Sequence, residues 1–212
     1  MKSRPFLIRA ENDDFALEPI QQDSPIHQES WLQKLLADHP QILTVEEIEP
    51  IFSPLVLIGR EISTEVGSID NLFISKSGYL VLVETKLWRN SEAKREVIAQ
   101  AIDYGSALSK WSYKKLNEVS KKINGRGIIE LLQNEFDPDP EDLPTDDMST
   151  KNLRLGRFLI LVVGDKIRES LIEMLNFVNR YPQLATNVGL VEMQCYVMPG
   201  TINDILVVPS IV

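Results

Sequence analysis

The feature that most constrains the fold of this chain is a run of apolar residues that ends in charged side chains. Leu80–Val83 is wholly apolar, and the three residues that follow it, 84–86, are polar or charged. We predict a strand over residues 79–85, a second strand over residues 69–75 and a turn over residues 76–78 between them. The chain therefore forms a hairpin whose second strand ends in charged side chains.

Predicted helices and strands alternate along the rest of the chain. Helices are predicted from Ser24 to about Asp38, from about Glu92 to Leu108, over Ile128–Gln133 and after Asp165, which can cap the last of them. Further strands are predicted at 55–58, 61–66, 157–163, 189–197 and 205–208. This order predicts an α/β fold with a mixed central sheet flanked by helices. We assign residues 1–23 to an N-terminal arm or strand and residues 24–212 to one domain, as the length favours.

The bulk charge argues against a simple basic nucleic-acid-binding domain, because the chain has 31 acidic and 22 basic residues and a net charge of −9. Residues 135–147, however, hold seven acidic residues and no basic one, and we expect an acidic, proline-punctuated loop at 135–150. Without residues 135–147 the net charge is −2. Between Lys86 and Lys122 there are nine basic and four acidic residues, a local charge of +5. Such a stretch suits contact with a phosphate backbone, and a solvated helix face is the alternative.

Two further observations concern the compartment. The single cysteine, Cys195, cannot form an internal disulfide, so we expect a cytoplasmic protein. The longest apolar run, Phe158–Val163, is far shorter than the roughly 20 residues that a bilayer requires. We therefore expect no membrane partner.

Asp70 lies in the first hairpin strand, and Glu84 and Lys86 end the second. Side chains alternate along a strand, so Glu84 and Lys86 point to the same face, and pairing in the hairpin can bring Asp70 beside them. Two carboxylates and an ammonium group suit phosphodiester chemistry that depends on Mg²⁺ or Mn²⁺. The alternative is an ion pair at the end of a strand, worth at most about 1 kcal/mol.

These residues resemble the motifs of the PD-(D/E)XK nuclease superfamily, which has the restriction-endonuclease-like fold. The matching segments are Gly67–Leu72, Val83–Lys86, the acidic residue Glu29 in the preceding helix, and Gln100–Tyr104. The last segment is similar to the Q-x-x-x-Y motif of the RecB-like and NucS-like branches. The resemblance covers about residues 29–108, and Ile69 stands where many members have proline.

The resemblance implies a role for each matching residue. Asp70 and Glu84 would bind the metal with the backbone carbonyl of Thr85, and Lys86 would be the catalytic lysine. Glu29 would complete the metal site through water or support it. A salt bridge that buries Glu29 is the alternative for that residue.

Gln100 and Tyr104 lie four residues apart and hence on one helix face. The resemblance implies that they contact the lysine, the phosphate or a flanking nucleotide. Tyr104 also continues the apolar stripe of its helix, so packing in the core is the alternative. Glu65 lies near the first hairpin strand, and we expect it on the surface.

The resemblance implies a metal-dependent nuclease that hydrolyses DNA. Two alternatives belong to other classes: an inactive module of the same fold that binds DNA or a protein, and an acidic adaptor with an unrelated α/β fold. No separate recognition domain is evident in 212 residues. A homodimer or a partner protein would then direct the enzyme to its target.

Overall fold

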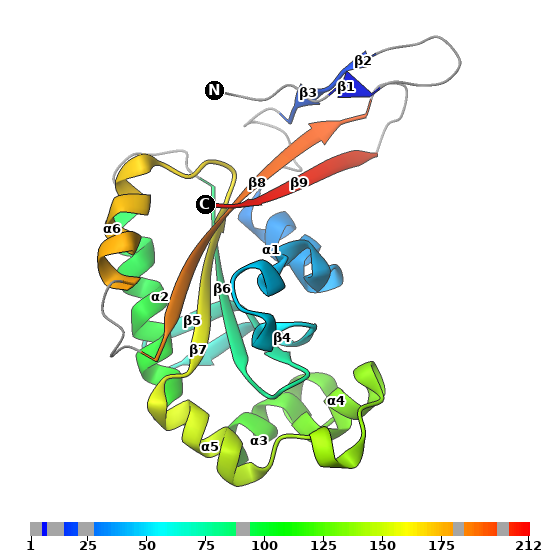
Figure 1. Cartoon of the computed structure of the whole chain (residues 1–212), viewed down its shortest axis with the longest axis vertical. Coiled ribbons are helices and arrows are strands. Elements are labelled where there is room, and N and C mark those ends of the chain that lie inside the picture. Colours follow the sequence, from blue (N-terminus) through cyan, green and yellow to red (C-terminus); the bar gives the residue numbers. More distant parts are fainter. Residues whose placement is uncertain (1–5, 8–14, 21–27, 88–93, 180–184, 199–203) are drawn as a thin grey trace.

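A sheet of seven strands forms the centre of the structure, a computed structural model that describes residues 6–7, 15–20, 28–87, 94–179, 185–198 and 204–212 (Figure 1). The strand order is β3-β8-β7-β6-β5-β4, and β9 also pairs with β8. The strands are β3 (Glu18–Pro19), β4 (Leu55–Thr64), β5 (Gly67–Ser75), β6 (Leu80–Lys86), β7 (Phe158–Gly164), β8 (Asn187–Val197) and β9 (Ile205–Ile211). Pairing is parallel between β6 and β7 and between β7 and β8, and antiparallel elsewhere. The prediction of a mixed central sheet is confirmed.

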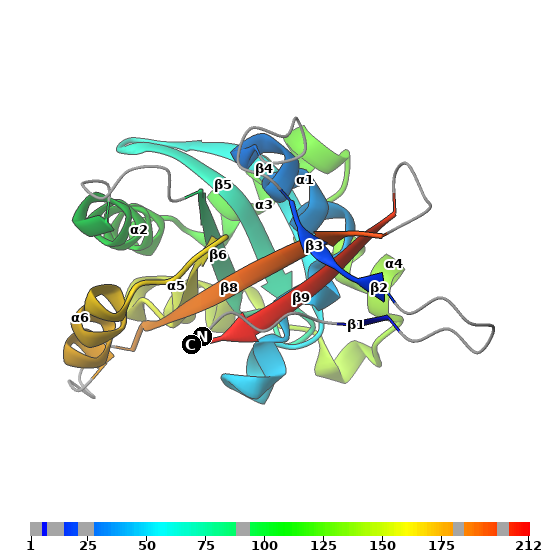
Figure 2. The same cartoon turned by 90° about the horizontal axis from the view of Figure 1, so that it is seen from above.

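Helices cover both faces of this sheet (Figures 1 and 2). The helices are α1 (Glu29–Asp38), α2 (Lys94–Ser109), α3 (Tyr113–Asn124), α4 (Ile128–Phe136), α5 (Asp146–Leu155) and α6 (Glu169–Asn179). Short 3₁₀ helices lie at Pro40–Leu43, Val45–Glu47, Pro50–Phe52 and Pro140–Asp142. One core cluster joins the sheet to α2, α3, α4, α5 and α6, and another joins the opposite face to α1 and the first three 3₁₀ helices. A separate pair of short strands, β1 (Phe6–Leu7) and β2 (Phe15–Ala16), lies beyond the ends of β8 and β9.

The alternation along β6 decides which face receives each charged residue. Leu80 and Leu82 belong to the cluster that contains α2, whereas Val81 and Val83 belong to the cluster that contains α1. Continuing this alternation places residues 84 and 86 on the α2 side of the sheet. The apolar run therefore sets the direction of the charges that follow it.

The predicted hairpin is confirmed, and its turn packs closely against a distant segment. Gly78 has a φ of +81°, and a Cβ atom there would lie 2.5 Å from the Cβ of Pro144. Only glycine satisfies both conditions. The two strands predicted at 55–58 and 61–66 are one strand, β4, which is continuous through an irregularity between Leu57 and Gly59.

Several predicted boundaries differ from the structure. Helix α1 begins at Glu29, and Ser24 and Pro25 lie outside the described residues. Helix α6 begins at Glu169, so the prediction that Asp165 caps it is wrong; the carbonyl of Arg168 accepts the first helical hydrogen bonds. Helix α3 was not predicted: its apolar residues Tyr113, Leu116, Val119 and Ile123 keep helical spacing, but they are few in a segment rich in lysine.

The acidic segment is partly helical. Its first residues complete α4, a 3₁₀ helix follows, and Asp146 and Asp147 open α5. Acidic side chains are favourable in the first turn of a helix, because the helix dipole is positive there. All seven acidic side chains of residues 135–147 are exposed to solvent. No helix in the described part of the chain has both the length and the apolar character needed to cross a bilayer.

Candidate active site

Asp70 and Thr85 meet where the pairing between β5 and β6 ends. The last paired residues there are Asn71 and Val83, and Asp70 comes next along β5. The backbone N–H of Thr85 donates to Asp70 Oδ2 at 2.7 Å, and the Thr85 hydroxyl donates to the same oxygen at 2.6 Å. Two donors on one carboxylate oxygen hold Asp70 in a defined orientation.

Glu84 is a buried carboxylate with an unsatisfied oxygen. The residue is 7% exposed, and Oε2 has no hydrogen-bond partner among the described residues. The pKa of Glu84 is raised to about 8, first by burial and also by the nearby charges of Asp70, Glu29 and Glu61, against the opposing effect of Lys86. A buried acid without a partner is costly, so this position favours either a proton or a bound cation.

Lys86 forms an ion pair with Glu29 of helix α1. Its Nζ lies 3.1 Å from Glu29 Oε1, and the same oxygen accepts a hydrogen bond from the Leu87 N–H at 3.1 Å. The side chains of Lys86 and Glu29 are 33% and 39% exposed. The alternative of a salt bridge that buries Glu29 is therefore not what the structure has: the pair is partly open to solvent.

A buried polar contact fixes helix α1 against the sheet and so positions Glu29. Asn71, fully buried on β5, donates from Nδ2 to the carbonyl of Gln33 at 3.0 Å. Arg60 on β4 donates to Gln33 Oε1 at 3.2 Å. Both contacts are made to Gln33, about one helical turn after Glu29 on α1. They hold the start of α1 where the Glu29 side chain reaches the end of β6.

Gln100 and Tyr104 form a pair on helix α2. Gln100 Nε2 donates to the Tyr104 hydroxyl at 2.6 Å, and Tyr104 is 4% exposed within the α2 core cluster. A Cβ atom on Gly67 would lie 3.0 Å from that hydroxyl, and Gly67 has a φ of +142°, so glycine permits this approach. Burial raises the pKa of Tyr104, as do the charges of Glu84 and Asp70, whereas the hydrogen bond from Gln100 lowers it. Tyr104 thus packs in the core, and its hydroxyl lies beside Gln100 and Gly67, close enough for the carboxylate charges to act on its pKa.

The structure gathers Glu29, Asp70, Glu84, Thr85 and Lys86 at one end of β6, with Tyr104 close enough for its charge state to respond to the carboxylates.

Sequence analysis missed two residues that contribute to this group. One is Glu61 of β4, whose charge acts on both Glu84 and Tyr104. The other is the Thr85 hydroxyl, since only its carbonyl was considered. No local pattern marks either one, because both depend on how the strands pair.

The basic stretch from Lys86 to Lys122 is not all beside this site. Helix α2 runs for 16 residues, about 24 Å, and carries the chain to α3 at the opposite end of the sheet (Figure 1). Lys110 pairs with Glu65, which is exposed, as expected for that residue. Lys115 lies over the ring of Trp111 at 5.9 Å.

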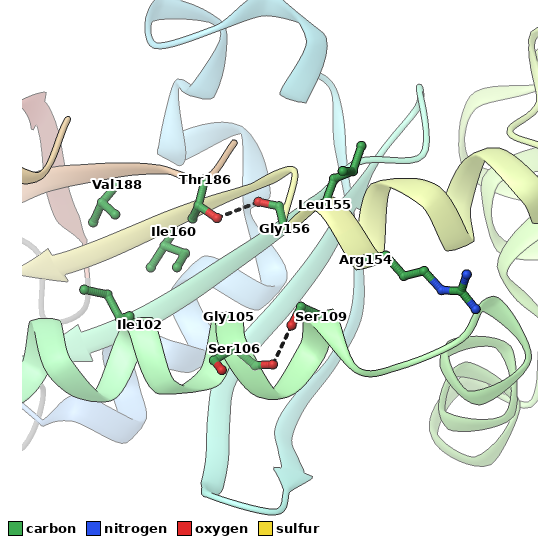
Figure 3. Close-up of a pocket in the computed structure, with 10 residues that line it drawn as sticks. All are labelled: Ile102, Gly105, Ser106, Ser109, Arg154, Leu155, Gly156, Ile160, Thr186 and Val188. Carbon is green, nitrogen blue, oxygen red and sulfur yellow. Dashed lines mark hydrogen bonds between the residues drawn. The ribbon is translucent and has the colours of Figure 1, made fainter. Parts of the chain in front are cut away.

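A cavity of about 290 Å³ lies at that opposite end, between α2, α5 and the first residues of β7 and β8 (Figure 3). Ile102, Ile160 and Val188 line its apolar part, and Gly105 and Gly156 border it. Two of its hydroxyl groups donate to backbone carbonyls: Thr186 to Gly156 at 2.5 Å and Ser109 to Ser106 at 2.7 Å. The cavity contains none of the predicted site residues.

Among the described residues, no three His, Cys, Asp or Glu side chains are gathered so as to hold a metal ion. The donors at the end of β6 are instead two carboxylates, Asp70 and Glu84, which are close enough for the charge of Asp70 to raise the pKa of Glu84. This set suits a cation that keeps several water ligands.

No protein-family model matches the chain, and no curated protein matches its sequence. Solved structures similar to it include a repair endonuclease from Pyrococcus abyssi, with 13% identity over 76% of this chain and 45% of that one, at a TM-score of 0.37. An EndoMS complex with double-stranded DNA has 14% identity over 84% of this chain and 50% of that one, at a TM-score of 0.41. SfsA of Pyrococcus furiosus in complex with Ca²⁺ has 12% identity over 76% and 57%, at 0.31. This chain spans about half the length of each, and the likeness is too distant to assign a fold family or an activity.

Proposed function

We propose that this chain is a metal-dependent nuclease of the PD-(D/E)XK type that hydrolyses DNA phosphodiester bonds. The observation that carries the proposal is Glu84, a buried carboxylate with an unpartnered oxygen beside Asp70. A protein that buries an acid in this way loses stability unless a proton or a cation joins it. The position, at the carboxyl end of a parallel strand, is where open α/β sheets bind ligands.

The donors fit Mg²⁺ or Mn²⁺. Asp70, Glu84 and the backbone carbonyl of Thr85 would hold the ion, and Glu29 would support it through water. Mg²⁺ is commonly bound by one or two carboxylates, with water and substrate phosphate completing its coordination. When bound, the ion polarises the phosphate and activates a water molecule.

The chain's own residues supply the remaining functions. Thr85 orients Asp70 through its N–H and hydroxyl groups. Glu29 holds the Lys86 ammonium group at the edge of the site, where it would stabilise developing negative charge or orient the attacking water. The Tyr104 hydroxyl, held by Gln100, would contact the lysine, the phosphate or a flanking nucleotide.

A cleavage assay tests this proposal. The substrates are linear, circular, single-stranded and branched DNA, each with Mg²⁺ and with Mn²⁺. We expect cleavage by the wild type and its loss in Asp70→Ala, Glu84→Ala and Lys86→Ala, while Lys151→Ala, which removes an exposed charge from α5, cleaves normally. Wild-type activity in Lys86→Ala, or no cleavage of any substrate by the wild type, would contradict the proposal.

One observation favours a second candidate, an inactive module of the same fold that binds DNA or a protein. Lys86 is ion-paired with Glu29, so its charge is partly neutralised. An inactive module would bind DNA without any dependence on divalent metal. Metal binding that depends on Asp70 and Glu84 separates the two candidates.

A further inference from the structure

The loop between β7 and α6, residues 165–168, lies at the same sheet edge as the proposed site. In the parallel part of the sheet Lys86 is paired with Gly164, and Gly164 with Glu192. Residues 165–168 follow Gly164 directly and lead to α6. The ends of β6 and β7 and the loop therefore share the upper end of the sheet in Figure 1.

Lys86, Gly164 and Glu192 form a row of paired residues across β6, β7 and β8, and the middle residue, Gly164, has no side chain. Neighbouring strands lie about 4.8 Å apart, so the Cα atoms of Lys86 and Glu192 are about 10 Å apart. The shared alternation of β6 and β8 directs both side chains to the α2 side of the sheet, since Leu190 and Leu82 belong to that core cluster. A ligand at Lys86 can therefore extend past Gly164 toward the loop.

Glu192 holds the loop in position. Its Oε2 accepts a hydrogen bond from the Ile167 N–H at 2.8 Å, and its Oε1 accepts one from Gln194 Nε2 at 2.8 Å. Gln194 Oε1 in turn accepts the Tyr196 hydroxyl at 2.7 Å. Both oxygens of Glu192 are thus engaged, and the carboxylate acts as a support for the loop backbone.

The loop carries two basic side chains, Lys166 and Arg168. Lys166 is exposed and Arg168 is half-buried, and neither forms an ion pair with any residue that the structure describes. The Arg168 carbonyl accepts the Leu171 N–H at 2.9 Å at the start of α6, which fixes its backbone. Lys86 differs from both, because Glu29 already partners it.

We propose that Lys166 and Arg168 bind backbone phosphates of DNA next to the scissile bond, with Glu192 positioning their loop. This inference rests on the proposed function. The proposed site is rich in carboxylates, since Glu29, Glu61, Asp70 and Glu84 act together there. DNA is a polyanion, and cations at the rim offset this repulsion and release counterions on binding.

The test is DNA binding measured separately from cleavage. A fluorescein-labelled duplex of about two helical turns is titrated with the full chain in EDTA at several salt concentrations, and anisotropy is recorded. Each lost phosphate contact lowers the slope of log K against log salt by about 0.9, so Lys166→Ala/Arg168→Ala lowers it by roughly 1–2. We expect an affinity loss of about tenfold or more, and a KM for cleavage that rises more than kcat falls.

The matched control is Lys151→Ala/Arg154→Ala, which removes the same charge from exposed positions on α5 at the other end of the sheet. Circular dichroism and thermal unfolding check that each variant is folded. If the loop variant binds with the affinity and salt slope of the control, the inference is overturned while the nuclease proposal stands. If the wild type neither binds nor cleaves DNA, the proposed function fails and the inference fails with it.

Discussion

The two ends of the parallel strands β6 and β7 differ in the kind of buried polar group that they leave without a partner. Near the amino end, helix α5 buries two neutral groups that have no hydrogen-bond partner in the described part of the chain, the Ser149 hydroxyl and Asn152 Nδ2. At the carboxyl end lies Glu84, the one acid among the buried unpartnered groups of the described residues. Leaving a neutral group unpaired costs far less than leaving a charge unpaired. The difference indicates that the carboxyl end is built to receive a ligand.

Substitutions of Tyr104 should have the largest effects on stability and cleavage, and they test the contrast between the two ends of the strands. Tyr104→Ala removes a core ring and should lower the free energy of unfolding by about 3–5 kcal/mol. Tyr104→Phe keeps the ring and should change the free energy of unfolding by less than about 1 kcal/mol, yet reduce cleavage about tenfold, because the hydroxyl lies within electrostatic reach of Glu84 and Asp70. Urea denaturation and cleavage rates measure the two effects.

Tyr113→Phe is the control for the hydroxyl. Tyr113 is also buried, on α3 at the amino end, so its loss of a hydroxyl should leave cleavage unchanged. Equal cleavage by the Tyr104→Phe and Tyr113→Phe variants would mean that Tyr104 serves the core alone.

Glu84→Gln should stabilise the metal-free protein at high pH. The folded pKa is about 8 and the ordinary value is 4.5, so the unfolded chain loses its proton first and wild-type stability falls as pH rises from 4.5 to 8. The amide of the variant cannot ionise, so its advantage should be near zero at about pH 4.5 and on the order of 4 kcal/mol at about pH 8. Urea denaturation in EDTA across this range measures it. Stability curves that stay parallel over the whole range would show that Glu84 ionises normally.

Thr85→Val should change the free energy of unfolding less than the preceding variants do. Thr186→Val is the matching substitution at the amino end of the parallel strands. Each removes one hydroxyl hydrogen bond, so each should cost about 1–2 kcal/mol of unfolding free energy. Only Thr85 orients a proposed metal ligand, so only its loss should weaken Mn²⁺ affinity, by about 10–100-fold. Calorimetric titration with Mn²⁺ distinguishes them, and equal Mn²⁺ affinity in the two variants would remove Thr85 from the site.

The strands and their motif residues were predictable because they depend on local patterns. Apolar runs and turn residues located β5, β6 and β7, and the charges that follow Val83 marked the proposed site. The contact between Thr85 and Asp70 and the row from Lys86 to Glu192 depend on strand register, which involves residues far apart in the chain. Helix α3 was missed for a different reason: its apolar residues keep helical spacing but are few among the lysines, and they pack against β4 and α5, which are distant in the chain.

The most direct measurement is calorimetric titration of Mn²⁺ into the metal-free wild type and into Asp70→Ala/Glu84→Ala at about pH 8, the pKa of Glu84. The account predicts that the wild type binds the ion at the carboxyl end of β6 and that the double variant does not, while Lys151→Ala binds like the wild type. Thermal unfolding in EDTA checks that all three proteins are folded. A wild type that binds no Mn²⁺, or a double variant that binds it equally well, would contradict the claim that Asp70 and Glu84 form a metal site.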